Sequence, residues 1–423
     1  MSFSRSLSAG VTGLQNYTTM MDVIGNNVAN INTVGFKSSR ITFGELFSQT
    51  LRGATQSTAS SGGTNPAQVG LGSSILSIDS LFTQGVIEST GNNSDLAIEG
   101  TGLFVVKQGT KTLYTRVGAF DRDASGNLVM KGVGATVQGK LADGTGVIPA
   151  GAPLQDINID MTRKSSPKAT DLVKLSGNVD ASGATYVPAS AGPPPVAESG
   201  EKVASTMSVF DSLGNKHALT LTLTKNATAN TWDYKVEDNV PTTLTTGTLT
   251  FNSDGTVNTG SPAVIPAITL TNGAADLNIS LDFTNLSQTQ GTSTVTPSDI
   301  NGYTAGDMNG WSVDQNGFIT ASFTNGQLMK LGQIVLAEPT NPAGLTRMGD
   351  GLYDLSANSG TAAIISPGPE SRSRILPGSL EQSNVDLPEE FTKMIIAQRG
   401  FQANSRVITT SDEILSEVVN LKR

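Results

Sequence analysis

The chain of 423 residues contains no cysteine, which excludes disulfide bonds and thiolate metal ligands. It has one histidine, His217, so a Ser-His-Asp triad would have to use this residue, and a metal site built from several histidines is excluded. No nucleophile elbow lies near His217, and no glycine-rich phosphate loop followed by Lys-Ser or Lys-Thr occurs. We therefore expect no cofactor and no enzymatic activity.

Charged residues are scarce, and long apolar runs are absent. Asp, Glu, Lys and Arg make up 15% of the chain, with a net charge of −9. Lys and Arg do not cluster, which disfavours nucleic acid and anionic membranes as partners. No stretch approaches the roughly 20 apolar residues that a membrane-spanning helix needs. Met1–Arg5 precede a polar amphipathic stretch, so we expect no cleaved signal peptide and no membrane insertion.

The residues that are abundant favour β-structure. The chain has 46 glycines, together with many Thr, Ser and Asn residues, a mixture typical of turn-rich extracellular β domains. Its length allows roughly two to four compact units.

Both ends of the chain show helical heptad patterns. The first predicts a helix over residues 1 to about 32, with its seam at Phe3, Leu7, Gly10, Leu14, Tyr17, Met21, Ile24, Val28 and Ile31. The second predicts a helix from Leu387, with Met394, Phe401, Ile408 and Leu415 at every seventh position and Phe391 and Val419 beside them. We expect the two helices to pack together or against neighbouring copies.

The first helix is weakened by Gly10, Gly13 and Gly25, each of which costs about 1 kcal/mol relative to Ala. We expect this helix to be largely unfolded in the isolated chain and to order when neighbouring helices cover its seam. As an alternative, the small residues allow another helix to approach closely.

An asparagine-rich turn follows the first helix. Asn26, Asn27, Asn30 and Asn32 compete with helical hydrogen bonds and tolerate left-handed backbone, so they should end the helix. Gly35 supplies a positive φ angle for the exit of the chain.

This turn carries a resemblance to a known family. Ala29, Asn30, Ile31, Asn32, Thr33, Val34, Gly35, Phe36 and Lys37 resemble the signature of the bacterial flagellar rod and hook family. Further resemblances to the same family lie, in order, in Ser6–Leu14 (the N-terminal helix), Ser94–Val106 and Tyr114–Phe120 (the first domain outside the helical core), and Gly378–Asp386 and Gln398–Arg406 (the C-terminal signature).

The composition predicts a nested α+β, mainly β, architecture. We expect a coiled-coil-like helical core at residues 1–32 and 385–423, connectors at 33–75 and 360–384, a β-rich domain at 76–149 and 300–359, and an inserted β domain at 150–299. The alternating run Ala218–Thr224 is the clearest strand. Gly53–Gly72 reads as an extended connector, and Asp386 should cap the last helix.

One stretch imitates a calcium loop. Asp121–Asn127 has the spacing of its first half, but Gly132 stands where a bidentate Glu is needed. We interpret it as a turn.

The resemblance implies a structural role. It implies a subunit that polymerises helically into the hook, a curved tube that acts as a universal joint between rod and filament and transmits motor torque. The distal rod, whose subunits are usually shorter, is the alternative. Implied partners are further copies, the flagellar rod, the hook-filament junction and hook cap proteins, and the type III export apparatus. The implied location is the extracellular flagellum, reached without a cleaved signal peptide.

Two sets of residues carry this interpretation. The polymer interface is expected at Leu7, Leu14, Met21, Ile24, Val28, Phe391, Met394, Phe401, Ile408 and Leu415, with packing inside one chain as the alternative for each. The direction in which the chain leaves the first helix is expected to depend on the signature residues Ala29, Asn30, Asn32, Thr33, Gly35, Phe36 and Lys37. From another class, a secreted β-rich adhesin or a carbohydrate-active enzyme using Asp211 with Glu237 or Glu198 remains open.

Overall fold

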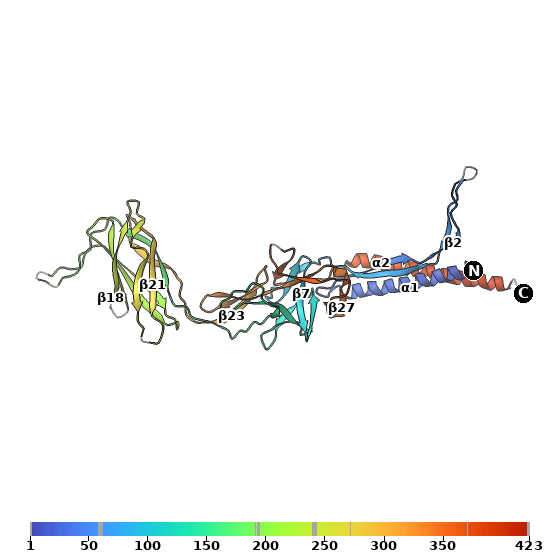
Figure 1. The fold of residues 1–423 in the computed structure, drawn as a ribbon, viewed down its shortest axis with the longest axis horizontal. Coiled ribbons are helices and arrows are strands. Elements are labelled where there is room, and N and C mark those ends of the chain that lie inside the picture. Colours follow the sequence, from blue (N-terminus) through green and yellow to red (C-terminus); the bar gives the residue numbers. More distant parts are fainter. Residues whose placement is uncertain are drawn as a thin grey trace. The chain divides into compact units, whose positions relative to one another are not determined.

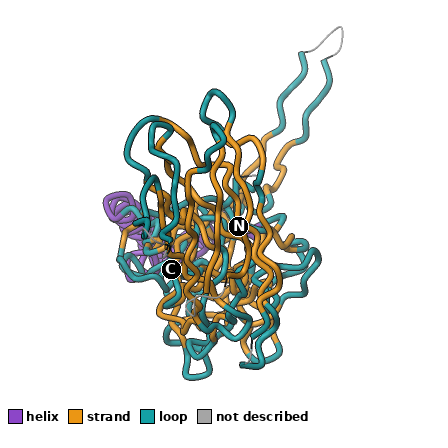
Figure 2. The backbone as a smooth tube through the Cα atoms, turned by 90° about the vertical axis from the view of Figure 1, so that its left-hand side faces the viewer, coloured by secondary structure: helices purple, strands orange, loops and turns teal. Residues whose placement is uncertain are grey.

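The computed structural model describes residues 2–57, 62–190, 192, 195–238, 243–270, 272–369 and 371–420. It divides into two compact units, each described by itself below. Unit 1 comprises Met1–Asp160, Trp311–Ala321 and Met329–Arg423, and unit 2 comprises Met161–Gly310 and Ser322–Leu328. Strands predominate, and the α-helices of the described residues stand at the two ends of the sequence (Figures 1 and 2). The predicted α+β, mainly β, fold class is confirmed, whereas the four-part division stays a prediction.

The terminal helices of unit 1 are α1 (Ser2–Ala29) and α2 (Leu387–Asn420). They lie side by side and antiparallel, with both chain ends at the same end of the pair (Figure 1). Helix α1 ends earlier than predicted, so Ile31 lies beyond it. Asn30 explains this end, because its amide donates to Asn26 O (2.9 Å) and Asn26 Oδ1 (2.7 Å) in place of helical continuation. Within the described residues, neither helix is long and apolar enough to cross a membrane.

Helix α2 begins as the sequence predicts. The Oδ1 atom of Asp386 accepts a hydrogen bond from the backbone N–H of Glu389 (3.2 Å), and Pro388 stands in the first turn, where a missing N–H costs nothing.

Two antiparallel ribbons follow α1. Strands β1 (Ser39–Glu45) and β4 (Ser73–Ser80) form the first, and β2 (Ser48–Arg52) and β3 (Ala67–Gly70) form the second, which stands away from the helices (Figure 1). The expected extended connector over Gly53–Gly72 is therefore wrong where β3 lies. Cross-strand hydrogen bonds from Gln68 to Thr50 (3.0 Å) and between Thr55 and Thr64 (2.7 Å) hold the second ribbon together. Residues 58–61 of the expected connector lie outside the described residues.

The remaining strands of unit 1 surround an apolar core. Leu103, Val105, Tyr114, Val335 and Ala337 are among its buried side chains. Phe104 and Phe120 meet edge to face, with their ring centroids 5.0 Å apart. These strands are β5 (Ile87–Ser89), β6 (Leu96–Glu99), β7 (Leu103–Gln108), β8 (Lys111–Thr115), β9 (Phe120–Arg122), β10 (Leu128–Met130), β11 (Thr136–Leu141), β12 (Gln155–Asp156), β26 (Leu336–Pro339), β27 (Thr346–Gly349), β28 (Leu352–Asp354), β29 (Ala362–Ile365), β30 (Arg374–Pro377) and β31 (Ser379–Glu381).

A few elements lie at the unit boundaries or outside the sheets. Strands β23 (Gly306–Val313), β24 (Phe318–Phe323) and β25 (Leu328–Ile334) each contain a boundary between the units. A 3₁₀ turn, η1, covers Pro342–Gly344 in unit 1.

Unit 2 contains two sheets that share one hydrophobic cluster. In the predicted strand over Ala218–Thr224, Leu219, Leu221 and Leu223 are buried, as alternation requires. The first sheet is β15 (Lys202–Phe210), β16 (Lys216–Lys225), β17 (Thr231–Asp238), β18 (Thr243–Phe251) and β19 (Val257–Thr259). The second is β20 (Ala263–Ile268), β21 (Leu277–Thr289), β14 (Leu172–Asp180) and β22 (Thr294–Ile300), while β13 (Lys164–Ser165) pairs with β23.

One turn recurs in both units. In Asp-x-x-Gly-x segments that begin at Asp123, Asp143, Asp211 and Asp314, Oδ1 of the aspartate accepts the backbone N–H groups two and four residues later. The glycine has a positive φ angle each time, 88° at Gly126. The segment that imitates a calcium loop is thus a hairpin turn between β9 and β10, as predicted.

The turn at Asp211 gives a first prediction. Asp211 is fully buried, and its Oδ2 atom accepts from the amides of Asn272 (2.6 Å) and Asn215 (3.1 Å). In Asp211→Asn an amide N–H₂ group replaces Oδ2 and faces the N–H₂ groups of Asn272 and Asn215, so two hydrogen bonds are lost. We expect the unfolding free energy of unit 2 to fall by about 1–3 kcal/mol. Urea unfolding followed by the fluorescence of buried Trp232, in a Trp311→Phe background, measures the loss.

The matched control is Asp254→Asn in the same unit. Asp254 is exposed, and its Oδ1 atom accepts hydrogen bonds from the backbone N–H and the hydroxyl of Thr256. We expect an unchanged midpoint, and equal losses for the two variants would contradict the proposed role of Asp211.

Candidate subunit interface

Helices α1 and α2 approach closely because their contact is built on small residues. A β-carbon at Gly13 would lie 2.7 Å from the Asn404 side chain, and one at Gly10 would lie 3.1 Å from Ile408. At Gly400 a β-carbon would overlap the ring of Tyr17. Of the two alternatives left open for the α1 glycines, close approach of a second helix is what this structure shows.

The predicted interface residues lie beside this contact. Ile24 is 3% exposed and belongs to the chain's own core. Leu7, Leu14, Met21, Val28, Met394 and Ile408 are half-buried. Phe391, Phe401 and Leu415 are exposed to 47%, 37% and 38%.

Sequence reasoning missed further apolar side chains on the surface. They lie on α2, off the seven-residue track that we followed, and on strand β4. The missed residues are Ile395, Ile396, Val407 and Ile414 on α2 and Leu76 and Ile78 on β4, and Val419 on α2 and Phe43, Phe47 and Leu51 after α1 are exposed as well.

The glycine contact can be tested with one substitution. Gly400→Ala should force α2 away from the Tyr17 ring and lower the melting temperature of the helices, although Ala is otherwise the better helix former by about 1 kcal/mol. Gly25→Ala is the control, because nothing lies within 4 Å of its added β-carbon, and it should raise the melting temperature. Far-UV circular dichroism follows both, and a rise for Gly400→Ala would contradict close packing at this point.

The signature residues anchor the helices through a buried charged junction, which we define as Lys37, Arg116 and Glu381. Each of the three is at most 3% exposed. Lys37 Nζ donates to Glu381 Oε1 (2.7 Å) and to the carbonyl of Thr83 (2.7 Å). Arg116 donates from Nε to Glu381 Oε2, and its remaining N–H groups reach the carbonyls of Ile98, Gly100 and Gly102. The charges are thus both paired and hydrogen-bonded, as burial demands.

Two polar side chains, the buried Asn27 and the half-buried Asn384, extend this junction to the helices. Asn27, at the end of α1, donates to Glu390 of α2 (3.1 Å) and exchanges two hydrogen bonds with the backbone of Ser39. Asn384 accepts from Ser38 N (2.7 Å) and donates to Leu81 O (2.8 Å). The end of α1, the start of α2 and the first ribbon are therefore held in one hydrogen-bonded network.

The signature residues have different surroundings. Gly35 has a φ angle of 68°, its N–H donates to Glu381 O (2.7 Å), and a β-carbon would lie 2.9 Å from the backbone of Arg116. Phe36 lies under the guanidinium of Arg347, 5.2 Å away. Asn30 is half-buried, and Ala29, Asn32 and Thr33 are exposed.

The electrostatics of the junction favour the carboxylate form of Glu381. Burial alone would raise its pKa, but the charges of Arg116 and Lys37 and their hydrogen bonds lower the pKa below its ordinary value. Burial lowers the pKa of Lys37, and the attraction of Glu381 opposes that shift.

Breaking the junction should destabilise unit 1. Glu381→Gln leaves two cations buried without their counterion, and we expect a loss of about 3–5 kcal/mol in unfolding free energy at neutral pH. The helical circular dichroism signal reports unit 1, because α1 and α2 both belong to it. Glu99→Gln is the control. Glu99 pairs with Arg374 (2.7 Å) at the surface and should matter little. Equal effects would contradict the anchoring role.

The same variant should change the pH dependence. Because the folded pKa of Glu381 lies below its ordinary value of 4.5, its stabilisation is complete above pH 4.5 and is lost as the pH falls through the folded pKa. As the pH falls below 4.5, the unfolding free energy of the wild type should therefore decrease more than that of the Glu381→Gln chain.

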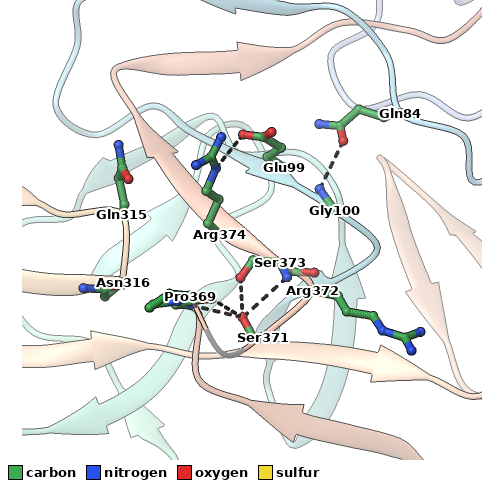
Figure 3. A pocket seen from close by; sticks show the side chains of 11 residues that line it. Gln84, Glu99, Gly100, Gln315, Asn316, Pro369, Ser371, Arg372, Ser373 and Arg374 are labelled. Carbon is green, nitrogen blue, oxygen red and sulfur yellow. Dashed lines mark hydrogen bonds and ion pairs between the residues drawn. The ribbon is translucent and has the colours of Figure 1, made fainter.

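Unit 1 also holds a polar cavity of about 660 Å³ (Figure 3). Several polar groups of its lining bond to one another or to the nearby backbone: Arg374 to Glu99, Gly100 N to Gln84 Oε1 (3.1 Å), and Ser371 to the loop around it. The hydrogen bond from Arg374 lowers the pKa of Glu99, which makes it a weak base. This lining suits a structural cavity better than an acid-base site.

The carboxylates considered for an enzyme have structural partners. Asp211 caps its turn and contacts His217 (3.2 Å), and these hydrogen bonds lower its pKa although burial opposes them. Glu198 pairs with Lys202 (2.7 Å) and Glu237 with Lys235 (2.6 Å). Among the described residues, no group of three His, Asp or Glu side chains is placed to hold a metal ion.

Comparison with known proteins defines the class. Four family descriptions match this chain: "Flagella basal body rod protein" at residues 7–37, "Flagellar hook protein FlgE/F/G D1 domain" at 97–181, "Flagellar basal body protein FlaE D2 domain" at 178–303 and "Flagellar basal body rod FlgEFG protein C-terminal" at 376–421. The signature turn and α2 lie in the two terminal matches. The chain is thus of the class of flagellar rod and hook proteins.

Full-length relatives narrow the class to one family. The flagellar hook protein FlgE of Borreliella burgdorferi is 38% identical over 99% of both chains, and that of Escherichia coli is 35% identical over 99% of this chain and all of its own. The flagellar basal-body rod protein FlgG of Bacillus subtilis is 30% identical over 99% of both chains. This chain belongs to the flagellar hook protein FlgE family and is a structural subunit of the hook.

A solved structure shows a related fold. The crystal structure of Helicobacter pylori flagellar hook protein FlgE2 matches with a TM-score of 0.50 and 14% identity, covering 70% of this chain and all of the other.

Proposed function

We propose that this hook subunit polymerises helically through its terminal helices into a curved tube that links rod to filament and transmits torque. The observation that carries the proposal is the apolar surface of α2, where Phe391, Phe401 and Leu415 remain 37–47% exposed although they stand on a helix of 34 residues. Exposed apolar side chains gathered on one element are typical of protein interfaces. Further copies of the chain are the partners that cover them.

The proposed contact surface consists of the residues predicted from sequence except Ile24, which the chain buries itself. Leu7, Leu14, Met21, Val28, Met394 and Ile408 are half-buried in the single chain, and a neighbouring helix would complete their burial at roughly 25 cal/mol per Å² of apolar area. Phe47, directly before β2, is 86% exposed, and Leu51 in β2 is 59% exposed. The ribbon formed by β2 and β3 therefore offers a second place for contacts between copies.

The charged junction would transmit force within each subunit. Torque that enters α1 and α2 reaches the strands of unit 1 through Lys37, Glu381 and Asn27, none of which can move without uncovering a buried polar group. Unit 2 has a Thr-rich surface, and its contacts in a tube would be polar and wet, so that they can shift as the tube bends.

The remaining partners and the export route follow from the family. We propose contacts with the rod, with hook-filament junction and hook cap proteins, and with the type III export apparatus, which would export the chain without a cleaved signal peptide. A chain without cysteine forms no disulfide that would hinder passage in an unfolded state. We propose no catalytic activity, in keeping with the structural partners of Asp211, Glu198 and Glu237.

Electron microscopy of the purified full chain tests the proposal. Under polymerising conditions we expect tubes, and Phe401→Ser combined with Leu415→Ser should abolish them, because both side chains lose their apolar contact area. Gln402→Ser with Thr409→Ser, two exposed polar positions on α2, is the matched control and should form tubes. A wild-type chain that stays monomeric under all polymerising conditions would refute the proposal.

A further inference from the structure

Helix α2 contacts α1 through one of its sides. Gly400 lies against Tyr17, Asn404 against Gly13 and Ser411 beside Ser6 (3.5 Å between hydroxyls). Since an α-helix turns about 100° per residue, these three contacts mark a single line along α2. The residues Arg399, Arg406 and Glu413, seven apart, lie on the opposite side and are exposed.

Two apolar stripes run along α2, one on each side of this contact line. Stripe A is the heptad track predicted from sequence, Met394, Phe401, Ile408 and Leu415, of which Ile408 also reaches Gly10 of α1. Stripe B consists of Ile396, Ala403, Val407 and Ile414, spaced by seven, four and seven residues and confined to about 40° of the helix circumference. Ile396, Val407 and Ile414 are 55%, 42% and 47% exposed, and Ala403 is exposed.

The stripes differ in size in a complementary way. Stripe A carries only large side chains, whereas stripe B has Ala403 and Val407 at its centre. Large side chains of one helix pack best against small ones of the facing helix. The shared seven-residue spacing lets such pairs repeat along both helices.

We propose that stripe A of one copy packs against stripe B of the next, so that the α2 helices of adjacent subunits lie side by side. This inference rests on the proposed assembly and adds the two surfaces and their pairing. A two-fold symmetric dimer would pair like surfaces and leave the other stripe of each copy in water. A head-to-tail contact covers both stripes of every copy and continues through the assembly.

Loss of stripe B should be as damaging as loss of stripe A. We expect Val407→Ser with Ile414→Ser to abolish tubes in the assay above, while circular dichroism shows that α2 remains helical. If this variant forms tubes like the wild type, stripe B is not an interface and the inference fails, although the proposed function stands. If the wild type forms no tubes, the proposed function itself fails.

Cross-linking tests the pairing itself. Because the chain has no cysteine, Val407→Cys places a single thiol on stripe B. Chains with this change are mixed with chains that carry one cysteine on stripe A, at position 394, 401, 408 or 415 in four separate mixtures, and the tubes are treated with a short bismaleimide.

We expect the mixed dimer in at least one mixture, in tubes and not in monomers, and little dimer from Val407→Cys tubes alone. The control position is Thr409→Cys, outside both stripes, which should give no mixed dimer. Dimers formed mainly between like positions, or no mixed dimer in any mixture of well-formed tubes, would overturn the pairing.

Discussion

The buried ion pair between Lys37 and Glu381 is the constraint on which unit 1 depends. The two residues are 344 positions apart in sequence, so their contact closes the chain and fixes where both helices leave the strands. Arg116 adds a second cation, and backbone carbonyls accept the N–H groups that the carboxylate cannot. Removing charges from water costs several kcal/mol per ion, and this cost is met only while the surrounding backbone keeps its position. The junction therefore makes the helix exit rigid rather than merely stable.

Close packing of the helices follows from that fixed exit. The helices must lie nearly in contact, and glycines at positions 10, 13 and 400 permit it. Because the residues at this contact are small, α1 and α2 bury little apolar surface between them. Hydrophobic burial inside one chain therefore stabilises the helix pair only weakly. The large apolar side chains stand to either side of the contact line. Intrachain packing and the exposed stripes are therefore consequences of one arrangement.

Much of this architecture could be predicted from the residues. The heptad spacing gave both helices, the asparagines gave the end of α1, and alternation at Ala218–Thr224 gave a strand with the correct buried face. The junction could not be predicted, because a lone Lys37 or Glu381 carries no local sign of a partner across the chain. Stripe B was missed because it does not follow the seven-residue track of stripe A. The β2–β3 ribbon was missed because polar cross-strand pairs, such as Gln68 with Thr50, leave no apolar periodicity.

The two units also differ in what their folding requires. Unit 2 has its own hydrophobic cluster, which includes Trp232 and Phe283, and turns such as that at Asp211 organise its strands locally. Unit 1 depends on contacts between the first and last residues of the chain, which close only when both segments are present. A subunit that arrives at its assembly site as an extended chain would thus form unit 2 by itself, whereas its helices would be fixed last. The apolar stripes of α2 would then become available when the junction closes, which couples completion of the fold to capture by the neighbouring subunit.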